Sequence, residues 1–290
     1  GISGFLLLSG VLAALILLSR MAVRDVTAPV LYFGTGQAPA SCADTPLAWQ
    51  AVDAAPAVRD GRPGTVFSLL RFGHPLGGER FLPMPGQFNL DNALGALAVC
   101  CDGLGVPVED ALAVLANVSV PGRFQVVTHE ALPEVSFIID YAHNGVSLAA
   151  ILDALRVYKP RRLICLFGSV GGRTFSRRRD MAEAAAHRAD LCILTSDNPG
   201  QENPDDIIRD IDRHFPADGC PRLLIPDREA AIREAVRLAC PGDIILLAGK
   251  GHEDYQLVGT RRVPFREEEI LRNALNSLGG YLSPDGAYLR

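Results

Sequence analysis

The second half of the chain alternates apolar runs with amphipathic stretches. Near-continuous apolar runs lie at residues 136–142, 162–168, 191–197, 222–227 and 243–251. Between them, apolar residues recur with the helical period at residues 147–158, 178–189, 204–215 and 228–239. This alternation is typical of a parallel sheet with helices on both faces. We therefore expect a doubly wound, Rossmann-like α/β domain.

The pattern over the first 120 residues is less regular. The expected elements are a strand and turn at 28–36, two hairpin strands at 64–73 and 79–86 joined by residues 74–78, and two helices at 89–105 and 108–118. Residues 36–63 show little periodicity and predict loops with at most one strand. The Pro-Gly pair in "VPGRF" at 120–124 is typical of a boundary, which predicts domains at 25–120 and 121–290.

An uncharged apolar run of about 18 residues, 2–19, lies at the start of the sequence, followed by Arg20 and Arg24. Its length reaches the lower limit for a membrane-spanning helix. No basic segment precedes it and no small-residue cleavage site follows, so we expect no secretory signal. A membrane anchor is the less favoured interpretation of residues 1–24, and a buried helix or a start other than the natural one are the alternatives.

Composition narrows the class of protein. With 290 residues, 48% of them hydrophobic and 21% charged, the chain has the make-up of an ordinary globular protein with room for two domains. A net charge of -5 gives no reason to expect nucleic acid as a partner. The seven cysteines show no CxxC spacing and lie mostly in apolar runs, which suits a reducing compartment. We expect a cytoplasmic monomer without a disulfide or zinc framework.

Polar residues follow each predicted strand of the second domain. They are Asp140 to Asn144, Ser169 to Arg173, Ser196 to Gly200, Asp227 with Arg228, and Gly249 to Asp254. Because ligands of parallel sheets bind beyond the carboxyl ends of the strands, these residues predict one site. Residues 249–251, "GKG", lack the spacing and the hydroxyl residue of a phosphate-binding P-loop. We expect a tight turn that presents Lys250, His252 and Glu253 to the crevice.

Six motifs in fixed order carry a resemblance to a known family. They are "MPGQFNLDNALGALA" (84–98), "PGRF" (121–124), "DYAHN" (140–144), "TSDNP" (195–199), "IPDR" (225–228) and "AGKGHEDYQ" (248–256). The last five resemble the carboxyl-terminal domain of the Mur ligases, and the first resembles the end of their central ATPase domain. The resemblance is good from residue 84 to about 272, loose over 25–83, and absent over 1–24.

Three family features have no counterpart in this sequence. Mur ligases have a GTNGKT-type P-loop in the central domain, preceded by a domain for the UDP group, and a carbamylated lysine beside magnesium. The chain has no such loop, and its first lysine is Lys159. The resemblance therefore implies a partial central domain at 25–120 and a complete amino-acid-binding domain at 121–290. We expect that this chain alone does not turn over ATP.

The chemistry that the resemblance implies is the addition of the third amino acid to the peptidoglycan peptide. ATP, with Mg²⁺, converts the carboxylate of UDP-N-acetylmuramoyl-L-alanyl-D-glutamate to an acyl phosphate, and a diamino acid displaces the phosphate. The residues expected to contact ATP are Asn92, Arg123, Asp140, His143 and Asn144. Local sequence leaves a helix N-cap open for Asn92 and a surface position open for Arg123. We assign no catalytic residue.

The amino-acid pocket is expected at Arg173, Asp197, Asn198, Pro199, Gly200, Gly249 and Glu253. A guanidinium suits the carboxylate of the amino acid and a carboxylate suits its ammonium group, so Arg173 and Glu253 form the expected pair. Relatives that add meso-diaminopimelate have arginine where this chain has Gly200. The acceptor is therefore left open between lysine, another diamino acid, and diaminopimelate held in another way.

Two other classes of function stay open at this point. A non-catalytic amino-acid-binding module would share the pocket. A metal-dependent hydrolase would use Asp140, His143, His252, Glu253 and Asp254, although these lack the HxH or HExxH spacing of a metal site. The basic run at residues 177–179 is expected to be a solvated surface at the start of a helix.

Overall fold

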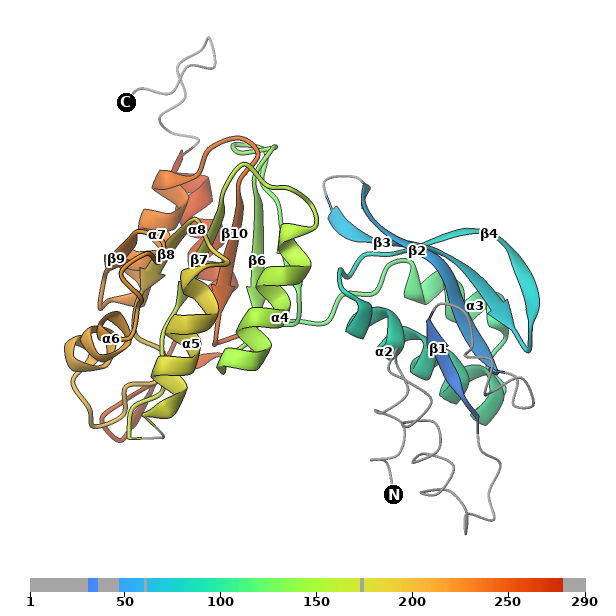
Figure 1. The fold of residues 1–290 in the computed structure, drawn as a ribbon, viewed down its shortest axis with the longest axis horizontal. Coiled ribbons are helices and arrows are strands. Elements are labelled where there is room, and N and C mark those ends of the chain that lie inside the picture. The colour runs from blue at the N-terminus through green and yellow to red at the C-terminus, as the bar shows by residue number, and fades with distance from the viewer. Residues whose placement is uncertain (1–30, 36–46, 60–61, 173–174, 279–290) are drawn as a thin grey trace. The chain divides into compact units, whose positions relative to one another are not determined.

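A computed structural model describes residues 31–35, 47–59, 62–172 and 175–278 of the chain. These residues belong to two compact units that divide between Ser119 and Val120 (Figure 1). The apolar run 2–19 and Arg173 lie outside the described residues. None of the helices in the described part is long and apolar enough to span a membrane.

The first unit is built on a four-stranded sheet with the order β1-β2-β3-β4. Its strands are β1 (Phe33–Thr35), β2 (Trp49–Arg59), β3 (Arg62–Arg71) and β4 (His74–Leu82), followed by α2 (Gln87–Leu97), the π-helical segment η3 (Ala98–Gly103) and α3 (Val108–Leu115). The β1–β2 pair is parallel, and the other neighbouring pairs are antiparallel. Trp49 is fully buried in the core of this unit and donates a hydrogen bond to Asp102 Oδ2 at 2.5 Å.

The hairpin turn of this unit lies elsewhere than we predicted. Phe72 and Gly73, with φ angles of 47° and 80°, connect β3 to β4. Two consecutive positive φ angles match the tight turns that follow the twist of paired strands. Residues 74–78, expected to form the loop, belong instead to β4. Because β4 is an edge strand, it tolerates the proline and the glycines that made this segment look like a turn.

The second unit contains the predicted doubly wound parallel sheet. Its strands are β5 (Gln125–Val127), β6 (Ser136–Asp140), β7 (Leu163–Phe167), β8 (Leu191–Leu194), β9 (Arg222–Leu224) and β10 (Ile244–Ala248), in the order β5-β6-β10-β7-β8-β9. Apart from the antiparallel β5–β6 pair, neighbouring strands are parallel. Strands β7 and β10 are buried at every position, as expected for strands covered on both faces.

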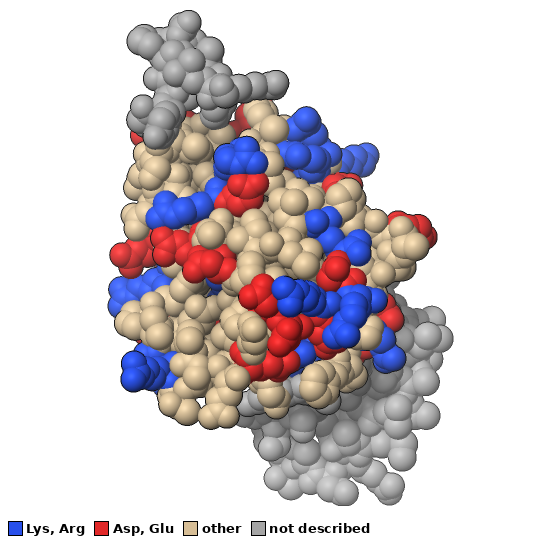
Figure 2. All heavy atoms as spheres, turned by 90° about the vertical axis from the view of Figure 1, so that its left-hand side faces the viewer, with Lys and Arg blue, Asp and Glu red and all other residues tan. Residues whose placement is uncertain are grey.

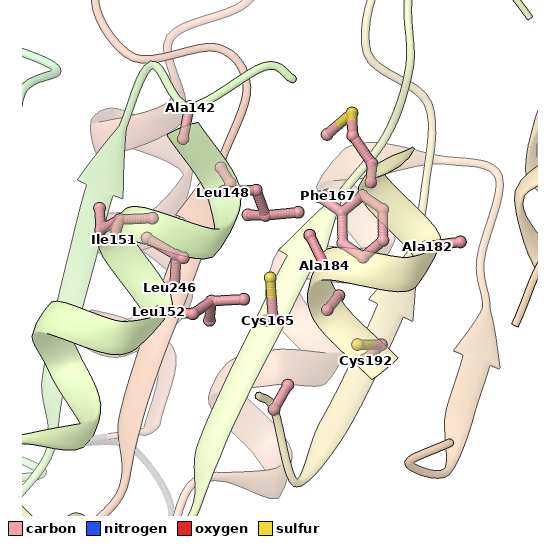
Figure 3. Packing of buried hydrophobic residues seen from close by; sticks show 14 of the residues in the cluster. Ala142, Leu148, Ile151, Leu152, Cys165, Phe167, Ala182, Ala184, Cys192 and Leu246 are labelled. Atoms are coloured by element: carbon pink, nitrogen blue, oxygen red, sulfur yellow. The ribbon is translucent and has the colours of Figure 1, made fainter. Parts of the chain in front are cut away.

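Helices cover both faces of this sheet. On one face lie α4 (Gly145–Arg156), α5 (Ser176–Ala186) and α6 (Pro204–Arg213), and on the other lie α7 (Arg228–Leu238) and α8 (Glu267–Leu278). Leu148 and Leu152 of α4 pack in one cluster with Cys165 and Phe167 of β7 (Figure 3). A small antiparallel hairpin, β11 (Tyr255–Val258) and β12 (Arg261–Pro264), follows β10 and was not predicted.

The basic run at residues 177–179 is not uniformly solvated, which corrects our expectation for Arg178. Its side chain is buried and forms ion pairs with Glu202 at 2.7 Å and Asp210 at 3.1 Å. Arg179 is exposed, as expected. Elsewhere on the surface, the face in Figure 2 shows basic and acidic side chains interspersed, without an extended patch of one sign.

The register of the sheet brings the carboxyl ends of the strands into line. Ala248 of β10 is paired with Asp140 of β6, and Phe167 of β7 is paired with Leu194 of β8. The helices that follow β6 and β10 cover opposite faces of the sheet. In sheets of this architecture, ligands bind beyond the carboxyl ends of the strands at the point where such a reversal occurs.

Candidate functional site

The loops that follow the strands meet at this edge of the sheet. Gly249 N donates to Asp140 O at 3.0 Å, and Gly171 N donates to Asn198 O at 2.9 Å. Gly122 approaches the turn after β10 so closely that a Cβ atom there would lie 2.1 Å from His252 N. With a φ of 67°, this position requires glycine on both counts. The predicted convergence of the strand-end segments is thus present in the fold.

Lys250 lies beneath the site rather than in the crevice, which corrects our expectation for its side chain. It is fully buried, and its Nζ donates to Asn198 Oδ1 at 2.9 Å, to Glu253 Oε2 at 2.8 Å and to Tyr255 O at 2.5 Å. A buried ammonium group is tolerated when oxygen atoms replace its water. These three acceptors do so, and they explain why the side chain turns inward.

Glu253 and Asn198 are fixed to each other as well as to Lys250. Asn198 Nδ2 donates to Glu253 Oε2 at 2.9 Å, and Leu257 N donates to Asn198 Oδ1 at 2.9 Å. Burial raises the pKa of Glu253, but the hydrogen bonds from Lys250 and Asn198 outweigh it and hold the pKa below its ordinary value. The site therefore contains a carboxylate that stays charged at neutral pH. Its second oxygen, Oε1, accepts a long hydrogen bond of 3.5 Å from the Tyr141 hydroxyl.

Asp197 adds a second negative charge at the same edge. Its side chain is buried, and its Oδ1 lies 3.8 Å from Lys250 Nζ. Burial raises the pKa of Asp197, and the nearby Arg228 and Lys250 only partly offset that rise. The next residue in the chain, Pro199, is also buried, and Gly200 after it has a φ of 59°. Gly200 N donates to Leu257 O at 2.9 Å, which places this turn beside β11.

A buried ion pair lies behind the site, and sequence reasoning missed it. Arg228 Nε donates to Glu267 Oε1 at 2.8 Å, while the Nη atoms of Arg228 donate to Ala248 O at 2.9 Å and Ser196 O at 3.3 Å. We had expected Asp227 and Arg228 to project into the crevice. Instead, Asp227 is the N-cap of α7, and Arg228 connects the ends of β8 and β10 to α8. The "IPDR" motif pointed to this position but not to its role.

Two of the residues predicted to bind ATP have their oxygens engaged inside the fold. Asp140 accepts hydrogen bonds from Phe124 N and Ala142 N, both at 2.8 Å, and burial raises its pKa more than these bonds lower it. Asn144 is the N-cap of α4, and its Oδ1 accepts from Ser147 N at 2.9 Å. Both residues shape the loop between β6 and α4. Contact of either with a nucleotide stays a prediction.

The other predicted nucleotide residues are placed as follows. Arg123 is exposed, with its guanidinium 5.0 Å from the centre of the Tyr141 ring, and His143 Nδ1 lies 2.8 Å from Tyr141 O. Tyr141, which sequence reasoning did not select, thus contacts Arg123, His143 and Glu253. Asn92 is exposed within α2 of the first unit, where the N-cap is Gly86, so the capping alternative for Asn92 is wrong.

The residue types proposed for a metal site do not assemble into one. Within the described ranges, no group of three or more histidine, cysteine, aspartate or glutamate side chains is arranged to hold a metal ion. His252 instead lies beside Tyr141, with ring centres 5.2 Å apart and ring planes tilted by 45°. The arrangement at this edge is therefore a pair of carboxylates, an amide and aromatic rings, which suits a cationic organic group better than a metal.

Comparison with known proteins agrees with this geometry. A family profile described as "Mur ligase, glutamate ligase domain" matches residues 122–251. The UDP-N-acetylmuramoyl-L-alanyl-D-glutamate-2,6-diaminopimelate ligase of Caldanaerobacter subterraneus is 44% identical over 197 residues, which cover 68% of this chain and 40% of that protein. The ligase of the same name from Synechococcus elongatus is 48% identical over 195 residues, covering 67% of this chain and 38% of that protein.

Solved structures extend the similarity to the fold. A UDP-N-acetylmuramoyl-L-alanyl-D-glutamate-2,6-diaminopimelate ligase aligns with a TM-score of 0.62 and 28% identity, over 91% of this chain and 51% of that one. The UDP-N-acetylmuramate-alanine ligase MurC of Thermotoga maritima shares the fold at a TM-score of 0.55 and 18% identity, over 86% of this chain and 48% of that one. The chain spans about 40% of the length of the curated relatives. By these matches and by the site at its strand ends, the chain belongs to the Mur ligase family.

Proposed function

We propose that the chain is part of an ATP-dependent ligase that joins a diamino acid to UDP-N-acetylmuramoyl-L-alanyl-D-glutamate, and that the edge described above binds the diamino acid. The names of the curated relatives, which match about two thirds of this chain, support the reaction. The observation that carries the proposal is the charged carboxylate of Glu253, held beside Asn198 at the strand ends.

A diamino acid has two amino groups with different tasks. The group that attacks the activated carboxylate must be free of its extra proton, whereas the other can remain a charged ammonium and serve as a handle. Glu253 offers a carboxylate to such a handle, and the Asn198 amide holds that carboxylate in place. Charge-assisted hydrogen bonds between an ammonium group and a carboxylate are among the strong ones. Positioning the handle would hold the reacting amine in place, which is a main source of rate enhancement in group transfer.

ATP with Mg²⁺ would supply the phosphoryl group that activates the substrate carboxylate, as in the family. The described residues fit part of that role. Arg123 and Asn92 are exposed and available to a nucleotide, whereas the side-chain oxygens of Asp140 and Asn144 already accept hydrogen bonds within the fold. We expect Arg173, which lies outside the described residues, to contact a carboxylate of the diamino acid. We also expect a cytoplasmic monomer.

Calorimetric titration of the chain with meso-diaminopimelate and with L-lysine tests the proposal. We expect at least one of the two to bind, and Glu253→Gln to weaken that binding by about tenfold or more, since a hydrogen bond to a charged group contributes roughly 1.5–3 kcal/mol. Glu229→Gln is the matched control, because Glu229 is an exposed glutamate on α7 that pairs with Arg233. Absence of binding for both amino acids, or equal binding by wild type and Glu253→Gln, would contradict the proposal.

A further inference from the structure

Lys250 is an unusual lysine in this chain. The sequence has lysine at two positions, Lys159 and Lys250. Lys159 is exposed, whereas Lys250 is fully buried. The ammonium group of Lys250 reaches three oxygens from separate parts of the site, on Asn198 after β8, on Glu253 in the turn after β10, and on the backbone of Tyr255 in β11. A buried lysine costs stability unless its charge is fully compensated, so such a position calls for a reason.

The contacts of Lys250 determine which atoms of the site remain for a ligand. Asn198 Oδ1 accepts from both Lys250 Nζ and Leu257 N, so the amide has one possible orientation, with Nδ2 towards Glu253. Glu253 Oε2 in turn accepts from Lys250 Nζ and from Asn198 Nδ2. Hydrogen bonds from Lys250 Nζ, Leu257 N and Asn198 Nδ2 thus fix one side of the Glu253–Asn198 pair. Glu253 Oε1 and the second N–H of Asn198 are left on the other side.

We infer that Lys250 is a positioning residue of the amino-acid site: it fixes the Glu253 carboxylate and the Asn198 amide so that Glu253 Oε1 is presented to a ligand ammonium group. The inference rests on the proposed function for the identity of that ligand. It adds a role for Lys250, a positively charged residue that favours binding of a positively charged ligand by positioning the Glu253 carboxylate. Lys250 does not contact the ligand; it acts by holding Glu253 so that Oε1, whose hydrogen bond from the Tyr141 hydroxyl is long at 3.5 Å, faces the ligand.

The charges around Glu253 agree with this assignment. Lys250 and Arg228 are the buried cations at this edge, and Asp197, Glu253 and Glu267 are the buried or half-buried anions. With all three carboxylates ionised, the cluster has one more negative than positive charge, which a single ligand ammonium group would neutralise. The other titratable groups that face it are Tyr141, whose hydroxyl points to Glu253, and His143, which lies near Asp197. Tyr255 lies beneath Lys250, with its ring centre 5.4 Å from Nζ.

Removal of the Lys250 charge should therefore change the pH dependence of binding. In wild type the pKa of Glu253 is below its ordinary value, so the carboxylate keeps its charge and its affinity for a cation into acid solution. In Lys250→Met, burial acts on Glu253 without its main opposing hydrogen bond, and its pKa should rise. Affinity should then be lost as the pH falls through a higher value than in wild type. A purely structural defect would lower affinity equally at every pH.

The first test requires no ligand. With ¹⁵N-labelled lysine the chain gives two Nζ signals, which Lys159→Met assigns by removing one. We expect the Lys250 ammonium protons to exchange slowly with water, because they are buried and hydrogen-bonded, and we expect Glu253→Gln to shift that signal. Exchange as fast as that of Lys159, or no response to Glu253→Gln, would overturn the inference whatever the chain binds.

The second test is a double-mutant cycle measured by titration with meso-diaminopimelate and L-lysine between pH 5 and 8. We expect Lys250→Met to weaken binding by about tenfold or more at neutral pH, and by much less in the Glu253→Gln background, because residues that act as a unit are not additive. Lys159→Met is the control and should bind as wild type. The double variant lacks both charges of the pair, and its comparison with Glu253→Gln measures the effect of Lys250→Met in that background even if Lys250→Met alone is unstable.

The outcomes separate the two proposals. Equal losses from Lys250→Met in the two backgrounds, with an unchanged pH profile, would overturn the positioning role while leaving the proposed function intact. If wild type binds neither amino acid, the proposed function fails, and the ligand-directed part of the inference fails with it. The exchange rate of the Lys250 ammonium protons then still decides whether Lys250 fixes Glu253.

Discussion

The substitution Arg228→Met removes a guanidinium that holds three parts of the second unit together. Arg228 is almost completely buried, and it donates to Glu267 Oε1, to Ala248 O and to Ser196 O. Methionine fills similar volume without a donor. The variant thus leaves the Glu267 carboxylate buried without its cation, while the two carbonyl groups at the ends of β8 and β10 each lose a hydrogen bond.

The expected loss is large because one partner of a buried ion pair is left uncompensated. Such single removals cost about 3–5 kcal/mol, whereas replacement of both charged partners is far milder. We therefore expect Arg228→Met to lower the free energy of unfolding of the second unit by about 3–5 kcal/mol, and Arg228→Met/Glu267→Gln to recover most of that loss. Arg233→Met, which breaks an exposed pair with Glu229 on the same helix, should cost less than about 1 kcal/mol.

The loss should also depend on pH in a direction that the structure fixes. Burial raises the pKa of Glu267 above its ordinary 4.5, and Arg228 opposes that rise. Without Arg228 the folded-state pKa rises further, while the unfolded value is unchanged. Above the ordinary pKa the folded state then binds more protons than the unfolded state, so stability falls as the pH rises. The deficit of Arg228→Met relative to wild type should be largest near pH 8 and should shrink towards pH 5.

Urea unfolding of the full chain at several pH values measures both effects. Circular dichroism follows the whole chain, and the single tryptophan, Trp49, reports on the first unit as an internal reference. A loss no larger than that of Arg233→Met would refute the stabilising role of Arg228. A deficit that grows as the pH falls would refute the role of Glu267.

Two further substitutions test the turns that form the site. Gly122→Ala should lower the free energy of unfolding by at least about 2 kcal/mol, because the added Cβ would lie 2.1 Å from His252 N at a φ of 67°. The control Gly259→Ala, with a φ of 61° and nothing within 4 Å of the added Cβ, should lower it by about 1 kcal/mol. Equal losses in urea unfolding would contradict the close approach at Gly122. Gly200→Arg has open space at Cβ but a φ of 59°, so it should cost about 1–2 kcal/mol of stability. It should also raise the preference for meso-diaminopimelate over L-lysine by about tenfold through one added charged hydrogen bond. An unchanged ratio of the two dissociation constants would show that another residue makes the selection.

The elements that depend on a periodic pattern of apolar residues, or on a few neighbouring residues, could be predicted from the sequence. Strands β7 and β10 are buried on both faces, so their near-continuous apolar runs identified them and implied a parallel sheet. The location of the site followed from that architecture, because the strand register brings the segments after the strands to one edge. The N-cap of α4 at Asn144 also had a local signal, a serine three residues later. We interpreted Asn144 instead as part of a nucleotide site.

What could not be predicted depends on where side chains meet in three dimensions. The local sequence does not show that Lys250 is buried rather than facing a ligand, because one of its three acceptors, Asn198, lies 52 residues away in the chain. The same holds for Arg228, whose partner Glu267 is 39 residues away in the chain. The β11–β12 hairpin gave no signal because β12 is exposed at every position and lacks an alternating pattern.

The most direct test of the central claim is a crystal structure of the chain with meso-diaminopimelate or L-lysine bound. We predict an ammonium group of the ligand within about 3.2 Å of Glu253 Oε1, with Lys250 Nζ still bonded to Glu253 Oε2 and Asn198 Oδ1. A ligand bound away from the ends of β6, β8 and β10, or one that contacts Glu253 through a carboxylate, would contradict the account.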